Sequence, residues 1–281
     1  MLNRSPWMTF LTYAILVAGV CLVGLPLWVT FVASTQTFEQ VVAAPMSLIP
    51  GTQIIKNYSA VLAGGSQDLS APVARMMMVS GFMALGVALG KIFISLLSAF
   101  ALIYFRFPFK TFFFWMIFVT LMLPVEVRIM PTYQVMSDLK LLNTYTGLIL
   151  PLVASATATF LFRQFFMTVP DELAEAAKLD GAGPLRFFWS VLLPLSRTNI
   201  AAMFVILFVY GWNQYLWPLL ITTDESMYSI VIGIRRMLAA GDAATEWHLV
   251  MATAMLAMIP PVLVVVLMQK WFVKGLVDSD K

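Results

Sequence analysis

The chain has 281 residues, of which 61% are hydrophobic and only 11% are charged, and its mean hydropathy is +0.90. A soluble domain cannot cover its surface with so few charges, so this composition excludes a water-soluble globular protein and indicates an integral membrane protein. The net charge of +3 identifies no partner, because in a membrane protein the positions of the cations matter more than their sum. The single cysteine, Cys21, lies in an apolar run and has no second cysteine with which to pair.

Six apolar stretches are long enough, or nearly so, to cross the hydrocarbon layer as helices of about 20 residues. They are Phe10–Ala33, Met77–Tyr104, Phe112–Met130, Tyr145–Phe165, Asn199–Leu220 and Leu249–Phe272. Strict alternation of apolar and polar residues is absent, so we expect an all-α membrane protein. The first stretch is too long for the apolar region of a signal peptide, and we expect it to remain as a spanning helix.

The positions of the cations predict the orientation. If the N-terminus is cytoplasmic, six spans bring the C-terminus back to the cytoplasm. The inside segments then carry Arg4, Arg106, Lys110, Arg163, Lys178, Arg186, Arg197, Lys270, Lys274 and Lys281. The outside segments carry only Lys56, Arg75, Lys140, Arg235 and Arg236. The excess of inside cations favours this orientation.

The connections between the spans differ in length and composition. Ser34–Arg75 is rich in proline, glycine and small polar residues, so we expect an external loop with one short helix around Ile54–Leu62. Arg106–Lys110 is a tight cytoplasmic turn, and Thr222–Trp247 is an amphipathic external connection. Pro131 is expected to end or bend the third span.

The longest strongly polar stretch, "DELAEAAKLDGAGP", lies in the cytoplasmic loop at residues 166–198. Asp171 and Glu172 follow Pro170, an order typical of the first turn of a helix, because proline needs no amide partner and acids stabilise the positive end of the dipole. Gly181 is expected to end this helix, and Pro184 to begin a second one.

Two interpretations of this loop are open. A connector lying on the lipid surface would be equally polar. Small alanines on the apolar face of the first helix would anchor poorly in lipid, however, and would let another protein approach closely. Asp180, in the last turn, opposes the helix dipole, although an Asp-Gly turn accounts for that residue locally.

Two stretches resemble a known family. "EAAKLDGAGPLRFFWSVLLPL", Glu175–Leu195, is similar to the EAA signature of the membrane permease subunits of binding-protein-dependent ABC importers: EAA, three residues, glycine, nine residues, isoleucine, then Leu-Pro. Val191 replaces the favoured isoleucine, a conservative departure. "YGWNQYLWPLL", Tyr210–Leu220, resembles the fifth-span signature of the maltose-type second permease subunit. The resemblance extends over about residues 76–272.

The resemblance implies a type I ABC importer transmembrane fold in the bacterial inner membrane. Residues 1–75 would form the first helix and a periplasmic loop, residues 76–272 the core with its coupling loop at 166–198, and residues 273–281 a cytoplasmic tail. The implied partners are a second homologous permease, two ATPase subunits that bind ATP and Mg²⁺, and a periplasmic substrate-binding protein.

The chain itself is not expected to be an enzyme or to hold a cofactor. It has no GxxxxGK[ST] phosphate loop, and ATP hydrolysis would therefore reside in the partner ATPases. His248 has no neighbouring ligand cluster, so we expect no metal site. The cations are dispersed, which argues against binding of nucleic acid.

In this family the first helix of the loop docks on an ATPase subunit, and closure of the ATPases turns the spans from inward-open to outward-open. The positions that match the motif are Glu175, Ala176, Ala177, Asp180, Gly181 and Ala182. Gly181 would allow the tight turn, the alanines would allow close seating, and Glu175 would offer a charge to a basic partner residue.

Four further stretches are most similar to family members that import sn-glycerol 3-phosphate: Ala43–Thr52, Phe113–Thr132, Ser155–Leu173 and Gly275–Lys281. We therefore expect import of sn-glycerol 3-phosphate and of glycerophosphodiesters. The alternative is another small sugar or polyol. A stand-alone secondary transporter fits less well, because such carriers usually show buried acid or histidine relays and paired broken helices.

Five residues are candidates for the substrate pathway: Lys91, Arg128, Trp212, Asn213 and Gln214. An unpaired ammonium in mid-span is costly, so Lys91 should contact an anionic substrate or bond to neighbouring helices. Arg128 either faces the pathway or anchors the chain at the interface. The polar groups of the other three would be costly against lipid, so they should line the pathway or bond between helices.

Overall fold

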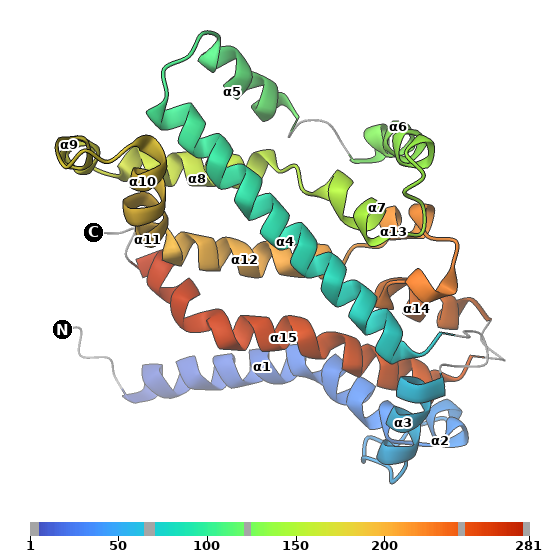
Figure 1. Ribbon diagram of the computed structural model, residues 1–281. Helices are drawn as coiled ribbons and strands as arrows, with labels where there is room; N and C mark the ends of the chain where they lie inside the picture. The colour runs from blue at the N-terminus through green and yellow to red at the C-terminus, as the bar shows by residue number, and fades with distance from the viewer. Residues whose placement is uncertain (1–5, 65–70, 121–124, 241–244, 278–281) are drawn as a thin grey trace. The chain divides into compact units, whose positions relative to one another are not determined.

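The computed structural model describes residues 6–64, 71–120, 125–240 and 245–277, and all regular structure in these residues is helical (Figure 1). The α-helices are α1 (Pro6–Ser34), α2 (Phe38–Val42), α3 (Ile54–Gly64), α4 (Val73–Tyr104), α5 (Lys110–Val119), α6 (Val125–Asp138), α7 (Tyr145–Ile149), α8 (Ala156–Thr168), α9 (Asp171–Leu179), α10 (Pro184–Phe187), α11 (Leu193–Leu195), α12 (Arg197–Trp212), α13 (Leu216–Ile221), α14 (Ile230–Met237) and α15 (Trp247–Val277). Short 3-10 segments cover Leu150–Leu152, Glu225–Met227 and Leu238–Ala240, and Phe188–Leu192 is π-helical. The expectation of an all-α protein is confirmed for the described residues.

The chain divides into two compact units, Met1–Arg75 with Gly233–Met258, and Met76–Ile232 with Ile259–Lys281. In the first unit, Thr37 and Gln40 form a reciprocal capping box at the start of α2. The buried amide of Asn57 donates to the carbonyls of Ser34 and Gln36, both at 2.9 Å, and so ties α3 to the end of α1. The short helix predicted around Ile54–Leu62 is therefore present as α3.

By length and apolar composition, three described helices qualify as membrane spans: Trp7–Ser34, Val73–Tyr104 and Trp247–Lys270. Two more qualify if a bent pair counts as one span. Tyr145–Leu152 meets Ala156–Thr168 at 51°, and Pro184–Leu195 meets Arg197–Trp212 at 73°. These helices make the chain a multi-pass membrane protein. The predicted third span is described only as α5 and α6, since residues 121–124 lie outside the described part.

Prolines lie near two points where the helices were expected to change. Pro131, expected to end or bend the third span, does not end its helix but lies inside α6, which continues to Asp138. A proline removes one backbone donor without preventing the following turn, and here the Thr132 hydroxyl adds a bond of 2.7 Å to the Arg128 carbonyl. The predicted fifth span instead breaks after Trp212. Pro218 offers no amide to the Gln214 carbonyl, so a continuous helix is disfavoured there.

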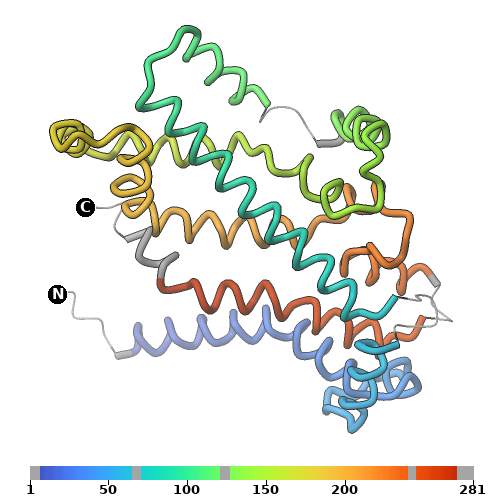
Figure 2. Tube along the Cα trace, in the orientation of Figure 1, coloured from blue at the N-terminus to red at the C-terminus, as the bar shows by residue number. Residues whose placement is uncertain are grey.

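In the second unit, α4 runs beside α7, α8 and α12 (Figures 1 and 2). Close approach depends on two glycines four residues apart. A Cβ at Gly86 would lie 2.5 Å from Ile149 Cδ1, and one at Gly90 would lie 2.6 Å from Val153 Cγ1. Small residues at this spacing let helices pack closely in membranes. The bent α7–α8 pair is thus seated on the middle of α4.

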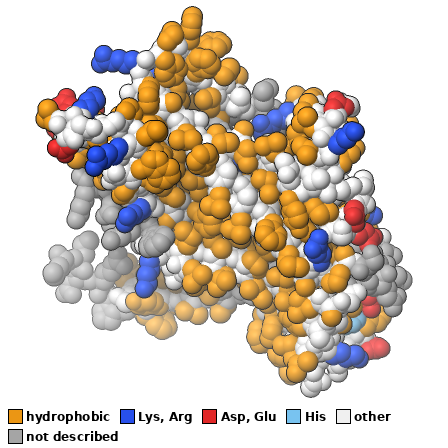
Figure 3. All heavy atoms as spheres, viewed as in Figure 1, with side chains coloured by type: hydrophobic (Ala, Val, Ile, Leu, Met, Phe, Trp, Pro, Cys, Tyr) orange, Lys and Arg blue, Asp and Glu red, His pale blue; other side chains and the backbone are white. Residues whose placement is uncertain are grey.

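A buried apolar cluster fixes the other end of the same unit. Val79, Met83 and Val87 follow one face of α4 at a spacing of four residues and pack with Trp217 of α13. The Trp217 indole donates to the Gly147 carbonyl at 3.1 Å, which joins α13 to α7. In Figure 3, hydrophobic side chains cover the face over α4, whereas charged side chains gather at α9.

Candidate functional site

Helix α9 forms where the polar stretch predicted it. Pro170 occupies the N-cap position, and Asp171 and Glu172 supply the acidic first turn. These two acids stabilise the positive end of the helix dipole, and Lys178 in the last turn stabilises the negative end. The predicted start of this helix is confirmed.

The end of α9 is a closed glycine turn. Gly181 has a φ of +71°, in the left-handed region that glycine adopts without strain. The Ala182 amide donates to the Ala177 carbonyl at 2.8 Å, and the Gly181 amide donates to the Lys178 carbonyl at 3.0 Å. This pair of bonds is a Schellman motif, so the predicted role of Gly181 in ending the helix is confirmed.

The structure separates the six motif residues by exposure. Glu175, Ala176, Asp180 and Gly181 are exposed, Ala182 is half-buried, and Ala177 is only 9% exposed. The alanines were expected to allow close seating of a partner, but Ala177 is buried within its own chain and only Ala176 is exposed. Adjacent residues of a helix point about 100° apart, so one side chain can face inward while the next faces solvent. Sequence reasoning missed Leu179, which is 89% exposed beside the glycine turn.

Five aromatic residues, the loop aromatic cluster, hold this segment to two longer helices. Its members are Phe100 and Tyr104 of α4, Phe166 of α8, and Phe187 and Phe188 of the second loop helix. The ring centroids lie 4.9 Å apart for Phe100 and Phe188, 5.2 Å for Tyr104 and Phe187, and 6.3 Å for Tyr104 and Phe166. The three phenylalanines that the loop and α8 contribute are buried. The loop therefore packs directly against α4 and, through Tyr104, is linked to α8.

The second helical segment of the loop, Pro184–Leu195, meets α12 at an angle of 73°. Phe188–Leu192 is π-helical immediately before Leu193-Pro194, and the missing amide of Pro194 interrupts the hydrogen-bond ladder there. Ser196, fully buried, donates its hydroxyl to the Leu192 carbonyl at 2.6 Å. The Leu-Pro of the sequence motif thus lies at the bend between the two helical segments.

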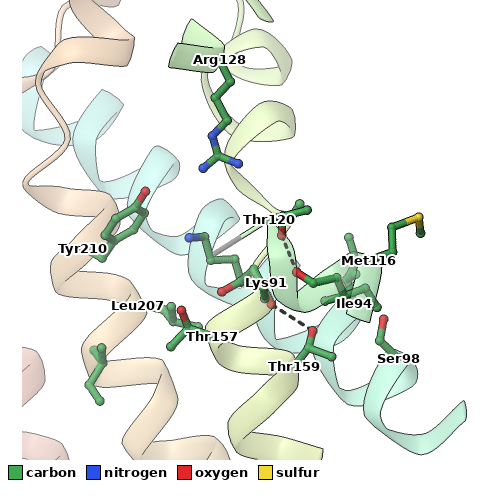
Figure 4. Close-up of a pocket in the computed structure, with 15 residues that line it drawn as sticks. Lys91, Ile94, Ser98, Met116, Thr120, Arg128, Thr157, Thr159, Leu207 and Tyr210 are labelled. Atoms are coloured by element: carbon green, nitrogen blue, oxygen red, sulfur yellow. Dashed lines mark hydrogen bonds between the residues drawn. The ribbon is translucent and has the colours of Figure 1, made fainter. Parts of the chain in front are cut away.

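A cavity of about 530 Å³ lies between α4, α5, α6, α8 and α12 (Figure 4). It is lined by Lys91, Ile94, Ser98, Met116, Ile117, Thr120, Arg128, Ala154, Ser155, Ala156, Thr157, Thr159, Ile206, Leu207 and Tyr210. Two of the five candidate pathway residues, Lys91 and Arg128, therefore face one space although 37 positions separate them in the sequence.

Lys91 is 6% exposed, and its ammonium lies 3.9 Å from the centroid of the Tyr210 ring. Figure 4 shows the amino group directed toward that ring and Arg128 pointing into the cavity from α6. Among the described residues, no acidic side chain or hydrogen-bond acceptor partners the Lys91 ammonium. The contact with Tyr210 is a cation–π interaction, which was not predictable from two residues so distant in sequence.

The other three candidates lie outside the cavity lining, at the end of α12. Trp212 is buried and stacks on Phe208 with a centroid distance of 6.0 Å. Asn213 is the exposed C-cap residue, and the Gln214 amide donates to the Tyr210 carbonyl at 3.2 Å. Trp212 is the last residue of α12, and Asn213 and Gln214 follow its end, so the predicted span Asn199–Leu220 is not one continuous helix.

A multi-pass helical chain with a cavity that two cations line among its helices, and with an exposed short helix at α9, has the features of a transport permease. The chain belongs to the family described as "Binding-protein-dependent transport system inner membrane component", which its residues 91–278 match. The family assignment made from the EAA motif is thereby confirmed.

The chain is similar along its whole length to proteins named sn-glycerol-3-phosphate transport system permease protein UgpE. It is 56% identical to the one from Brucella melitensis over 282 residues, 56% identical to one from Escherichia coli over 281 residues, and 57% identical to the one from Agrobacterium fabrum over 282 residues. Each comparison covers 100% of both chains. These relatives are transport permeases rather than enzymes.

The fold resembles that of a chain in the crystal structure of a bacterial ABC transporter involved in the import of the acidic polysaccharide alginate. The TM-score is 0.81, and the match covers 97% of this chain and 99% of that one. Because the two sequences are only 20% identical, this likeness establishes the fold alone.

Proposed function

We propose that the chain is a permease subunit of an ATP-driven importer of sn-glycerol 3-phosphate and glycerophosphodiesters. The observation that carries this proposal is the identity of 56–57% over the full length to three permeases named for that substrate. A cavity that two cations face suits a phosphorylated substrate and favours it over the alternative, an uncharged sugar or polyol.

The proposed topology has six spans with both ends in the cytoplasm of a bacterial cell, in the inner membrane. Three long helices and two bent pairs supply five spans, and α5 is assigned to the third span in chain order. The excess of cations on the side of α9 supports this orientation.

Within the proposed complex, the chain pairs with a second homologous permease, and the two enclose the substrate path. Two ATPase subunits bind ATP and Mg²⁺ at the cytoplasmic face, and a periplasmic binding protein delivers the substrate. This chain contributes neither a cofactor nor a catalytic residue.

Helix α9 is the proposed contact with an ATPase subunit. Its exposed Glu175, Ala176 and Asp180, together with Gly181 and half-buried Ala182, form the docking surface, and Leu179 adds an apolar contact. Closure of the ATPases would move α9, and the loop aromatic cluster would pass that displacement to α4 and α8. A loosely held loop would absorb the displacement instead.

Lys91 and Arg128 are proposed to face the substrate path through the cavity that they line. We place exposed Asn213 and half-buried Gln214 near one end of the substrate path, where they follow the last residue of α12. We assign Trp212 to helix packing, because its side chain is buried against Phe208.

Copurification and reconstitution test the proposed function. The tagged chain, gently solubilised, should bring with it an ATPase subunit and a second permease, and the reconstituted complex should take up sn-glycerol 3-phosphate only with ATP and the binding protein. Recovery of the chain alone, or ATP-independent uptake, would contradict the proposal.

A further inference from the structure

The cavity around Lys91 contains a buried cation to which the described residues offer no anionic partner. Lys91 lies near the middle of α4, is 6% exposed, and contacts only the face of Tyr210 with its ammonium among the described residues. An ammonium held in a membrane span without a counter-ion is costly and usually marks a functional site. A ligand with negative charge would supply the missing partner.

A helix N-terminus opens into the same cavity. Ser155 caps α8 by accepting a bond from the Ala158 amide at 3.3 Å, and Ser155, Ala156 and Thr157 all line the space. The first amides of a helix have no partner within it, and together with the helix dipole they favour an anion. The Ser95 hydroxyl donates to the Ser155 carbonyl at 3.3 Å, which fixes this helix end against α4, one turn from Lys91.

Arg128 supplies a second cation from α6. Its exposed side chain points into the cavity from another side than Lys91 (Figure 4). The lining also contains the hydroxyl groups of Ser98 and Thr157. Two cations, a helix N-terminus and hydroxyl groups converge here, and among the described lining residues both charged side chains are positive.

We propose that this cavity is a subsite for the phosphate group of a phosphate monoester, held between Lys91, Arg128 and the N-terminal amides of α8. The inference rests on the proposed function and adds the recognising groups and the preferred charge. A guanidinium binds two phosphate oxygens in its fork geometry, while an ammonium acts as a point charge on a third.

The arrangement selects for charge. A phosphate monoester, with a second pKa of about 6, carries about −1.5 to −2 charges at pH 7, whereas a diester carries only one. Two cations balance the monoester. After loss of Lys91, the single positive charge of Arg128 still neutralises the one negative charge of a diester. It neutralises only about half of the charge of a monoester. Lys91 therefore sets the preference for the monoester over the diester.

Tyr210 acts as a positioning residue for Lys91. The ammonium lies 3.9 Å from the centroid of the Tyr210 ring, beside the space where the phosphate would sit. A phosphate attracts the ammonium more strongly than a ring does, so the lysine can leave the ring when substrate arrives. Tyr210→Phe preserves the ring face, and Tyr210→Leu removes it.

The test uses the complete complex in proteoliposomes, with its ATPases, second permease and binding protein. Initial uptake of radiolabelled sn-glycerol 3-phosphate and of glycerophosphocholine is measured at saturating binding protein and substrate, which removes the binding protein's own preference from the comparison. Lys91→Met should lower monoester uptake and the monoester-to-diester ratio about tenfold, the loss expected for one charge-assisted hydrogen bond. Lys91→Arg should restore most of both.

Matched variants exclude general effects of charge or folding. Lys140→Met removes an exposed lysine outside the cavity and should change neither value. Tyr210→Leu should shift the ratio in the same direction as Lys91→Met, and Tyr210→Phe should stay near wild type. Binding-protein-stimulated ATP hydrolysis should persist in every variant, showing that the complex is assembled.

Three outcomes would overturn the subsite. These are an unchanged monoester rate in Lys91→Met, an equal loss for both esters, and a ratio that shifts only in vesicles containing anionic lipid. The last result would mean that a lipid headgroup occupies the cavity. Failure of the wild-type complex to take up the monoester would instead contradict the proposed function, so the two failures are distinguishable.

Discussion

The α9 loop and the cavity around Lys91 are built in opposite ways. The loop exposes its charged groups on the short helix α9, and its buried aromatic rings pack against rings of α4 and α8. The cavity buries one cation among apolar helices, and its groups come from five separate elements. The loop is suited to transmit displacement to the spans whatever the substrate is. The cavity is suited to discriminate between substrates. Variants in the two regions should therefore fail differently.

Loss of a ring from the loop aromatic cluster should have the largest effect. Phe188→Ala removes a side chain that is buried against Phe100, and such a deletion costs about 3–5 kcal/mol in a packed core. We expect uptake of both esters to be lost while ATP hydrolysis continues. Measurement of uptake per ATP hydrolysed checks this, with Phe188→Leu as the control that keeps most of the apolar volume. Coupled uptake in Phe188→Ala would show that the cluster does not transmit the movement.

The contact between α12 and α4 should be next in size. A Cβ at Gly211 would lie 2.9 Å from the Ala84 Cα, and backbone cannot move aside easily. Gly211→Ala should therefore destabilise the chain by about 1–3 kcal/mol and shift Tyr210 relative to Lys91. Thermal unfolding of the detergent-solubilised complex measures the first effect, and the ester ratio measures the second.

Gly81→Ala is the matched control for that substitution, since a Cβ at Gly81 meets nothing within 4 Å. It should be neutral or stabilise α4 by up to about 1 kcal/mol. If both variants unfold at the same temperature, close packing at Gly211 does not support the cavity.

A side chain at the glycine turn should have a smaller effect on stability but a clear effect on coupling. Gly181→Val forces a β-branched residue to a φ of +71°, at a cost of about 1–3 kcal/mol. The expected result is more ATP hydrolysed per molecule of substrate imported. Gly183→Ala, where φ is −69° and nothing crowds the Cβ, should behave as wild type. Normal coupling in Gly181→Val would refute the requirement for a rigid turn.

Charge reversal on the docking surface should give the smallest effect. Glu175 is exposed, so an ion pair with an ATPase subunit contributes at most about 1 kcal/mol and is screened by salt. Glu175→Lys should lower retention of the ATPase subunit during purification at low salt, and the difference from wild type should shrink at high salt. Equal retention under both conditions would remove Glu175 from the contact.

Local sequence signals predicted the loop well. Pro170 with two acids marked the start of α9, and Gly181 marked its end, because caps and turns depend on neighbouring residues. Exposure was less predictable. Ala177 turned inward and Leu179 outward, and the choice depends on where the helix rests on the remainder of the chain.

The cavity was predictable only in part. Lys91 was a candidate because an ammonium in a span needs an explanation, but its contact with Tyr210 arises from the packing of α12 on α4. Asn199–Leu220 was predicted to be one continuous span because its composition is apolar throughout. Composition does not show the helix break that precedes Pro218, so the polar groups that follow Trp212 lie between two helices. Of the two alternatives predicted for Pro131, an end of the helix is excluded, because α6 continues through it.

Coupling and substrate choice can be separated by one pair of measurements on the same two complexes, Gly181→Val and Lys91→Met. These are the monoester-to-diester uptake ratio and the amount of ATP hydrolysed per ester imported. Gly181→Val should raise ATP consumption per ester with an unchanged ratio. Lys91→Met should lower the ratio about tenfold while ATP hydrolysis remains stimulated by the binding protein. A shifted ratio in Gly181→Val, or an unshifted one in Lys91→Met, would contradict the separation of coupling from substrate choice.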